Sequence, residues 1–340
     1  MAERLLTFQQ AEAEALCQEM RRDPNVIFMG EDIVGGAGRA AEGLVDAWGG
    51  PFGTYKGLVH EFGEERVRDT PISEAGFIGA AVGAAVTGLR PIVELMFCDF
   101  VGVCLDQIFS NCAKMRYMFG GKVTIPFTLI ARTGAGNQMG AQHSQSLHAL
   151  FAHIPGLKVV TPSDPYTAKG LLTAAIRDDD PVVYLQNKLL SVVRTPAPVP
   201  EDPYIWPIGK ARVLKTGSDV TLVGMARTTQ FCVEAARVLE GEGINAEIID
   251  LLSLSPIDYD TVLTSVRKTH RIVVVDEDTA RCNVASEVVA IVADEAFDSL
   301  DAPPKRVSAP HTCIPYSAPL EAAYMPDAPR IVAAARSLVG

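Results

Sequence analysis

Several motifs that define large enzyme classes are missing from this chain of 340 residues. It has no GxSxG nucleophile elbow, no HExxH pair, no Walker phosphate loop and no GxGxxG dinucleotide fingerprint. Each of these motifs carries its own chemistry, so their absence argues against an α/β hydrolase, a zinc peptidase, an NTPase and a simple NAD enzyme.

Positive charge and long apolar runs are also scarce. The formal net charge is −11, which argues against binding to nucleic acid or to an anionic membrane. The longest apolar stretch, residues 77–86, is shorter than the roughly 20 residues of a membrane span. The N-terminus lacks the pattern of a signal peptide, and the seven cysteines form an odd set without a CxxC pair. We therefore expect reduced, mostly buried thiols in a cytoplasmic protein, with neither disulfides nor a zinc site.

What the chain does have is enough apolar sequence for a sizeable core, since 48% of its residues are hydrophobic and 21% are charged. Apolar strand patterns alternate with helical patterns, which predicts an α/β fold of two domains with mainly parallel sheets. Five prolines crowd residues 196–207, where neither pattern persists. The predicted organisation is a first domain at 1–190, a linker at 191–207 and a second domain at 208–340.

The most informative stretch is 69–90. Pro71 favours a turn, Ser73 is a good N-cap, and Glu74 falls in the first turn of a helix. The residues that follow are apolar on nearly every side and include four glycines, so we expect a buried, closely approached helix. Glu74 is then either a partner of the helix dipole or a buried acid with a perturbed proton affinity.

Other local patterns predict further elements. Thr7-Phe-Gln-Gln10 has the form of a capping box and opens a helix to about residue 22. Residues 26–29 form a strand that ends in Glu31 and Asp32, where ligands of parallel sheets gather, although a solvated turn is the alternative. A single helical face is expected from residue 100 onward. It consists of Val101, Leu105, Ile108, Cys112 and Met115, and Gly120-Gly121 ends it.

Two glycine-rich segments are candidate loops of a site. Residues 35–63 lack the spacing of a phosphate loop, which favours a mobile loop near an active site. Residues 133–145 place His143 among glutamines, where a helix could begin. His143 is either a structural histidine or a group that titrates near neutral pH and orients a polar ligand.

Several motifs in order give the chain a family resemblance. They are Met29-Gly-Glu-Asp, Asp69-Thr-Pro-Ile-Ser-Glu-Ala-Gly-Phe, Gly88-Leu-Arg-Pro-Ile, Gln142-His-Ser-Gln, Pro155-Gly-Leu-Lys-Val-Val and Val274-Val-Asp-Glu. With them the chain resembles, over nearly its whole length, the beta subunit of thiamine-diphosphate-dependent 2-oxo acid dehydrogenases. Segments such as Gly30-Glu-Asp-Ile-Val-Gly-Gly-Ala-Gly and Glu94-Leu-Met-Phe-Cys-Asp-Phe are most similar to acetoin dehydrogenase beta subunits.

This resemblance implies a transketolase-like pyrimidine-binding domain followed by a transketolase C-terminal domain. It also implies that Glu74 hydrogen-bonds the ring nitrogen of the cofactor's aminopyrimidine and favours its imino tautomer. Phe100 would pack on that ring, with an ordinary core phenylalanine as the alternative, and Met96 would line the same pocket. His143 would face the thiazolium ring and the substrate.

In some relatives the region of Asp178 and Asp180 holds a structural potassium ion. This chain has Asp180 where asparagine is common, so a solvated run of charge is the alternative there.

The family also implies a divided active site. Gly-Asp-Gly, which opens the usual Mg-diphosphate signature, is absent here, because in this family the alpha subunit holds the diphosphate and Mg²⁺. The chain would therefore be inactive alone and would form a heterotetramer of two alpha and two beta subunits, docked on a lipoyl acyltransferase core.

The expected reaction is the cleavage of acetoin, with release of acetaldehyde and transfer of the two-carbon unit to the lipoyl acyltransferase. A pyruvate or branched-chain 2-oxo acid dehydrogenase is the alternative within the class. A non-catalytic scaffold subunit is the alternative from another class.

Overall fold

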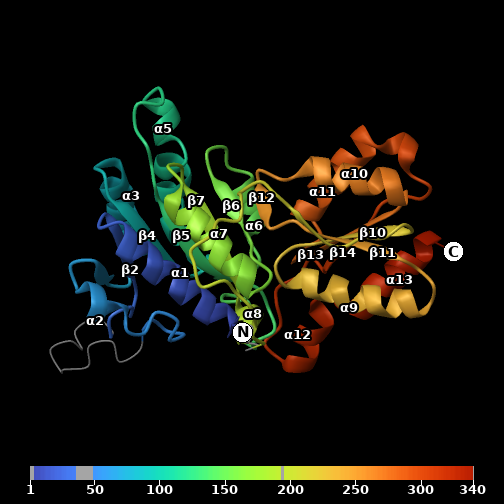
Figure 1. Cartoon of the computed structure of the whole chain (residues 1–340), viewed down its shortest axis with the longest axis horizontal. Coiled ribbons are helices and arrows are strands. Elements are labelled where there is room, and N and C mark those ends of the chain that lie inside the picture. Colours follow the sequence, from blue (N-terminus) through green and yellow to red (C-terminus); the bar gives the residue numbers. More distant parts are fainter. Residues whose placement is uncertain (1–3, 36–48, 193–194, 340) are drawn as a thin grey trace.

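The computed structural model describes residues 4–35, 49–192 and 195–339, which form two lobes lying side by side (Figure 1). The strands are β1 (Leu5–Leu6), β2 (Val26–Gly30), β3 (Val67–Asp69), β4 (Arg90–Phe97), β5 (Thr128–Thr133), β6 (Lys158–Val160), β7 (Val182–Asn187), β8 (Ala197–Pro198), β9 (Arg212–Lys215), β10 (Val220–Gly224), β11 (Ala246–Asp250), β12 (Ser253–Ser255), β13 (Ile272–Thr279) and β14 (Lys305–Ala309). The longer helices are α1 (Phe8–Arg22), α3 (Glu74–Val86), α7 (Pro165–Arg177), α9 (Arg227–Gly241), α10 (Tyr259–Thr269), α11 (Val284–Glu295) and α13 (Ala328–Val339). The shorter helical segments are α2 (Leu58–Phe62), η2 (Cys98–Phe100), α4 (Val101–Asp106), η3 (Gln107–Cys112), α5 (Met115–Met118), α6 (His148–Ala152), α8 (Lys188–Val192), η4 (Phe297–Ser299) and α12 (Ala318–Tyr324).

Both large sheets are mainly parallel, which confirms the predicted α/β class. The first has the order β12-β6-β7-β5-β4-β2-β3, and the second has the order β14-β13-β10-β11-β9. Only the edge strands β12 and β9 run antiparallel to their neighbours. Because β12 lies well after the proline-rich segment, the second half of the chain adds a strand to the first sheet, a pairing that no local pattern predicted.

Helices cover both faces of each sheet. In the first lobe α1 and α7 pack on one face through residues such as Leu16 and Leu172, while α3 and α4 pack on the other. The core beneath α3 continues into the second lobe, where it includes Val223 and Ile249. A shared core therefore joins the two lobes and fixes the second lobe against the first.

Helix starts agree with the local sequence where capping residues are present. The capping box at Thr7 is confirmed, because its hydroxyl accepts the Gln10 N–H at 3.3 Å and the Gln10 amide oxygen accepts the Thr7 N–H at 2.9 Å. In the same way Asp164 accepts the Thr167 N–H at 2.7 Å and begins α7. These contacts satisfy N–H groups that a helix leaves unpaired at its start.

The single helix predicted from residue 100 onward was wrong. Cys104 has φ −120° and ψ 18°, which breaks α4, and η3 continues as a π-helical turn. The break turns Cys104 into the core and leaves Leu105 37% exposed, although the spacing had placed Leu105 on the buried face. Gly120 and Gly121 end the segment as predicted, both with positive φ.

The prediction that α3 is buried on every side holds for one face only. Phe77, Ile78 and Ala81 are buried, but Gly76, Ala80 and Gly83 face outward. The single chain therefore leaves an apolar stripe of small residues, Gly76–Ala80–Gly83, uncovered directly after Glu74.

The proline-rich segment contains the short strand β8. β8 pairs antiparallel with β1 and ties the linker to the start of the chain. All seven cysteines are free thiols, four of them buried. No helix within the described ranges is long and apolar enough to cross a membrane.

Candidate active site

The site is built around three buried acids, one directly after β2, one within β4 and one in the first turn of α3. Glu74 is 8% exposed in the first turn of α3, and no described residue donates a hydrogen bond to it. Glu31, which directly follows β2, is 7% exposed, and Glu94 of β4 is 2% exposed. Gly30 is the register partner of Glu94, so Glu31 and Glu94 lie on adjacent parallel strands.

The acids affect one another. Burial, and after it the charges of Glu74, Asp32 and Glu94, together raise the pKa of Glu31 to about 7. The alternative of a solvated turn at Glu31 was therefore wrong, because this carboxyl is buried and holds a proton near neutral pH.

This raised pKa makes a prediction for Glu31→Gln. The unfolded carboxyl ionises near pH 4.5 and the folded one near 7, so the folded state of the wild type loses stability as pH rises through that window. Glutamine does not ionise, so the free energy of unfolding of the variant, relative to wild type, should rise by about 1 kcal/mol from pH 5 to pH 8. The full pKa shift would imply a larger change, but solvent screens part of the charge. Urea unfolding of both proteins at pH 5 and 8 measures the change. A constant difference would contradict the assigned pKa.

Three aromatic rings, those of Phe97, Phe100 and His143, pack against one another and are called the aromatic wall below. The His143 ring centre is 4.9 Å from that of Phe97 and 5.3 Å from that of Phe100, both edge-on. The Cys104 thiol lies 3.7 Å from the Phe100 carbonyl oxygen, and its pKa is raised by burial and then by the charge of Glu74. The structure thus brings the rings of Phe100 and His143 together, and α4, which follows Phe100, shares a core with α3, which carries Glu74.

The remaining predicted pocket residue, Met96, is half-buried at the end of β4. The pairing of β4 with β5 shifts register between Leu95 and Phe97, which places Met96 at the irregularity.

A buried arginine behind the acids was missed by the sequence analysis. Arg132 of β5 is 1% exposed, with its guanidinium 3.5 Å from a Glu94 oxygen and 3.3 Å from the Thr54 hydroxyl. It also lies 3.7 Å from the centre of the Phe52 ring. The one available signal was a charged residue inside the apolar strand β5, since buried charges are usually paired.

Phe52 and Thr54 belong to the glycine-rich segment 35–63. Residues 36–48 of it, and with them much of the predicted mobile loop, lie outside the described residues. The part from 49 onward contains α2 and a buried Tyr55, and it packs onto Arg132.

His143 does not open a helix, because the next helix, α6, begins at His148. The loop bends back instead, and the Lys188 ammonium donates to the His143 carbonyl oxygen. Gln145 donates its backbone N–H at 3.2 Å and its side-chain amide at 3.0 Å to Asp99, the residue before Phe100.

The acids at 178–180 are paired with cationic side chains. Lys158 donates to both oxygens of Asp178 at 2.8 Å and lies 3.2 Å from an Asp180 oxygen. Arg116 also pairs with Asp180. These cationic side chains already pair with the carboxylates that were predicted to bind potassium, and their charges disfavour a further cation there.

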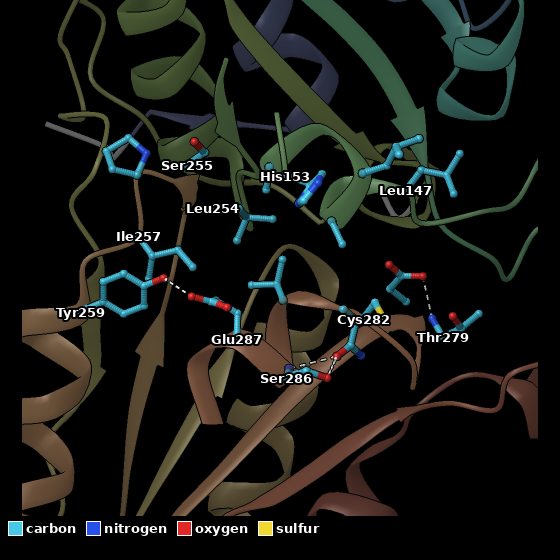
Figure 2. A pocket seen from close by; sticks show the side chains of 17 residues that line it. Leu147, His153, Leu254, Ser255, Ile257, Tyr259, Thr279, Cys282, Ser286 and Glu287 are labelled. Carbon is cyan, nitrogen blue, oxygen red and sulfur yellow. Dashed lines mark hydrogen bonds between the residues drawn. The ribbon is translucent and has the colours of Figure 1, made fainter. Parts of the chain in front are cut away.

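A large cavity of about 1130 Å³ lies elsewhere, between the two lobes (Figure 2). Leu147 and His153 line it from one side, and Tyr259 and Glu287 from the other, joined by a hydrogen bond of 3.2 Å. None of the predicted site residues lines this cavity.

The fold and site define a transketolase-like protein. Residues 5–191 match the family model of the transketolase pyrimidine-binding domain, and residues 209–331 match that of the transketolase C-terminal domain. A solved structure of a split-gene transketolase, an inactive beta4 tetramer, has a TM-score of 0.76 at 24% identity and covers 98% of both chains. At that identity the likeness concerns the fold alone.

Relatives with known activities show which members of the transketolase-like class this chain is similar to. The beta subunit of the acetoin:2,6-dichlorophenolindophenol oxidoreductase of Bacillus subtilis (strain 168) is 51% identical, over 99% of this chain and 98% of the relative. The corresponding subunit of Cupriavidus necator is 53% identical, over 98% and 97%. The mitochondrial pyruvate dehydrogenase E1 component subunit beta-2 of Oryza sativa subsp. japonica is 41% identical, over 97% and 85%. The chain belongs to the family of thiamine-diphosphate-dependent acetoin and 2-oxo acid dehydrogenase beta subunits.

Proposed function

We propose that this chain is the beta subunit of an acetoin-cleaving, thiamine-diphosphate-dependent dehydrogenase. The observation that carries the proposal is a buried carboxyl, Glu74, at the start of α3, a helix that shares its core with α4, which directly follows Phe100 of the Phe100–His143 pair. Two relatives that share more than half of their aligned residues with this chain are acetoin oxidoreductase subunits, which favours acetoin over pyruvate.

The residues fit one half of the cofactor. A buried acid next to a half-buried aromatic ring suits a flat nitrogen heterocycle, which needs one hydrogen bond and one packing surface. The same place does not suit a diphosphate, because Glu31, Glu74 and Glu94 offer it no positive charge and Arg132 is already engaged by Glu94. We therefore assign the pyrimidine half to this chain and the diphosphate with Mg²⁺ to the alpha subunit.

Each site residue then has a role. Glu74 shares its proton with a pyrimidine ring nitrogen, Phe100 packs on the ring and Met96 closes the pocket beside it. His143 holds or accepts a proton at the substrate oxygen. When bound, thiamine diphosphate acts as the electron sink for the bond cleavage.

The uncovered stripe Gly76–Ala80–Gly83 supports a partner chain at this place. Small residues on an apolar helix allow another backbone to approach closely, and this face begins two residues after Glu74. We assign it to the alpha subunit in a complex of two alpha and two beta chains, which passes its two-carbon unit to a lipoyl acyltransferase. The seven free thiols are in keeping with a cytoplasmic location.

Reconstitution tests this function. The chain, an alpha-type partner that carries Gly-Asp-Gly, thiamine diphosphate and Mg²⁺ are combined and assayed with acetoin and with pyruvate, using 2,6-dichlorophenolindophenol as electron acceptor. We expect turnover of acetoin, little turnover of pyruvate and none from the chain alone. Preference for pyruvate would favour the 2-oxo acid alternative, and turnover of neither substrate would favour a scaffold.

A further inference from the structure

We propose that Glu321, in the second domain, is a positioning residue that holds the loop carrying His143. This loop, residues 134–145, is called the His143 loop below. The inference rests on the proposed function, since it concerns the residue expected to face the substrate. It gives the second domain a part in the active site of its own chain.

Both carboxylate oxygens of Glu321 accept hydrogen bonds from the start of the loop. It lies in α12 and is 2% exposed. One oxygen accepts the Gly136 N–H at 2.8 Å, and the other accepts the Gln138 N–H at 2.9 Å. Hydrogen bonds from backbone N–H groups to a carboxylate are about twice as strong as bonds between neutral groups. A buried acid with two such bonds fixes the direction of the backbone between them.

A second acid from the same domain holds the preceding residue. Glu277 of β13 accepts the Ala135 N–H at 2.7 Å, and its other oxygen accepts the Asn187 side-chain amide at 2.9 Å. Three backbone N–H groups within four residues of the loop are therefore bound by carboxylates that the first domain does not supply.

The backbone between these contacts adopts conformations that need support. Gly136 has φ +107° and Gln138 has φ +55°, both in the left-handed region. A Cβ at Gly136 would lie 2.2 Å from a methyl carbon of Leu189, so the loop passes closely over α8. Positive φ at a residue other than glycine is costly and persists where surrounding contacts dictate it. The contacts here are those of Glu321.

In the part of the chain that the structure describes, the hydrogen bonds at the far end of the loop come from the first domain. Lys188 donates to the His143 carbonyl oxygen, and Asp99 binds Gln145. Between the two sets of anchors, Gln138, Ala141 and Gln142 are exposed. With Glu321 removed, the near side keeps the bond from Ala135 to Glu277 but loses the bonds at Gly136 and Gln138, and the His143 ring is expected to leave its place against Phe97 and Phe100.

The test compares Glu321→Gln and Glu321→Ala with a matched control, Glu247→Gln. Glu247 is also a buried acid of the second domain, paired with Lys268 and accepting the Gly217 N–H at 3.2 Å, but it does not touch the His143 loop. All variants are assembled with the alpha partner, thiamine diphosphate and Mg²⁺. The readouts are acetoin kinetics, the affinity for thiamine diphosphate, and hydrogen exchange of peptides spanning residues 134–145.

We expect Glu321→Ala to lower kcat for acetoin by about 10- to 100-fold, the loss typical of a misplaced group, with less change in KM. Exchange of loop amides should become faster, while cofactor affinity stays near that of wild type because Glu74 and Phe100 are held by other elements. Glu321→Gln keeps the volume and one acceptor oxygen, so it should lie between wild type and alanine and carries the test if the alanine variant fails to assemble. Glu247→Gln should leave loop exchange and kcat unchanged.

Two results would overturn the inference. One is unchanged loop exchange in both Glu321 variants, and the other is faster exchange with an unchanged kcat. If the wild-type complex does not turn over acetoin, the proposed function fails instead, and loop exchange still reports whether Glu321 holds the loop.

Discussion

Replacing Glu74 by glutamine is expected to lower acetoin turnover of the assembled complex by about 10²- to 10⁴-fold, the range for loss of a general acid or base. Glutamine has nearly the same shape but cannot share a proton with a ring nitrogen. The fold should survive, because no described residue donates a hydrogen bond to Glu74. Steady-state kinetics measure the first effect, and urea unfolding measures the second.

The control for this prediction is Glu287→Gln. Glu287 is also an acid in the first turn of a helix, α11, but it is exposed and lies away from the aromatic wall. If Glu74 acted only on the helix dipole, both variants would lose about 0.3–1 kcal/mol of stability and neither would lose activity. Full turnover by Glu74→Gln would contradict the role assigned to this carboxyl.

His148→Gln is expected to destabilise the chain by about 3–5 kcal/mol near pH 6, the cost of removing one partner of a buried ion pair. His148 of α6 contacts Asp276 of β13 at 2.8 Å, and both side chains are buried between the two lobes. Burial alone would lower the pKa of His148, but the charge and hydrogen bond of Asp276 outweigh it and raise that pKa to about 9. Glutamine would leave the Asp276 charge buried without its partner.

The effect should depend on pH in a defined direction. The raised pKa of His148 stabilises the folded state, and this stabilisation is complete at pH values below 6.5, the pKa of the unfolded histidine. It is lost as the pH rises through 9, the pKa in the folded state. The difference between wild type and His148→Gln should therefore shrink from pH 6 to pH 9.5, as measured by urea unfolding.

The double variant His148→Gln/Asp276→Asn provides the control for this pair. It carries no buried charge at this place, so it should be more stable than His148→Gln alone. A difference that stays constant with pH, or a double variant less stable than either single one, would argue against a charged pair.

Features of the fold set by neighbouring residues could be predicted from the sequence. The capping box at Thr7 predicted the start of α1, and the alternation of strand and helix patterns predicted parallel sheets. Features set by distant contacts could not. β12 crosses from the second half of the chain to pair with β6, and the break at Cys104 overrides a regular helical spacing.

The same distinction applies to the site. Glu74 could be singled out because an acid opened a helix that was otherwise apolar and rich in glycine. The family resemblance assigned Phe100 and His143 to one cofactor site, and the structure showed that their rings are in contact. Two other contacts join residues far apart in the chain. Arg132 pairs with Glu94, and Glu321 accepts hydrogen bonds from the His143 loop. No local pattern encodes such pairs, so only the folded structure showed them.

The central claim is that this chain supplies only the pyrimidine half of a cofactor site shared with another subunit. A crystal or cryo-electron microscopy structure of the reconstituted complex with thiamine diphosphate tests it most directly. We predict the Glu74 carboxyl within hydrogen-bonding distance of a pyrimidine ring nitrogen, with the diphosphate and Mg²⁺ bound by the partner chain. A Glu74 side chain turned away from the pyrimidine, or both halves of the cofactor bound within one copy of this chain, would contradict the claim.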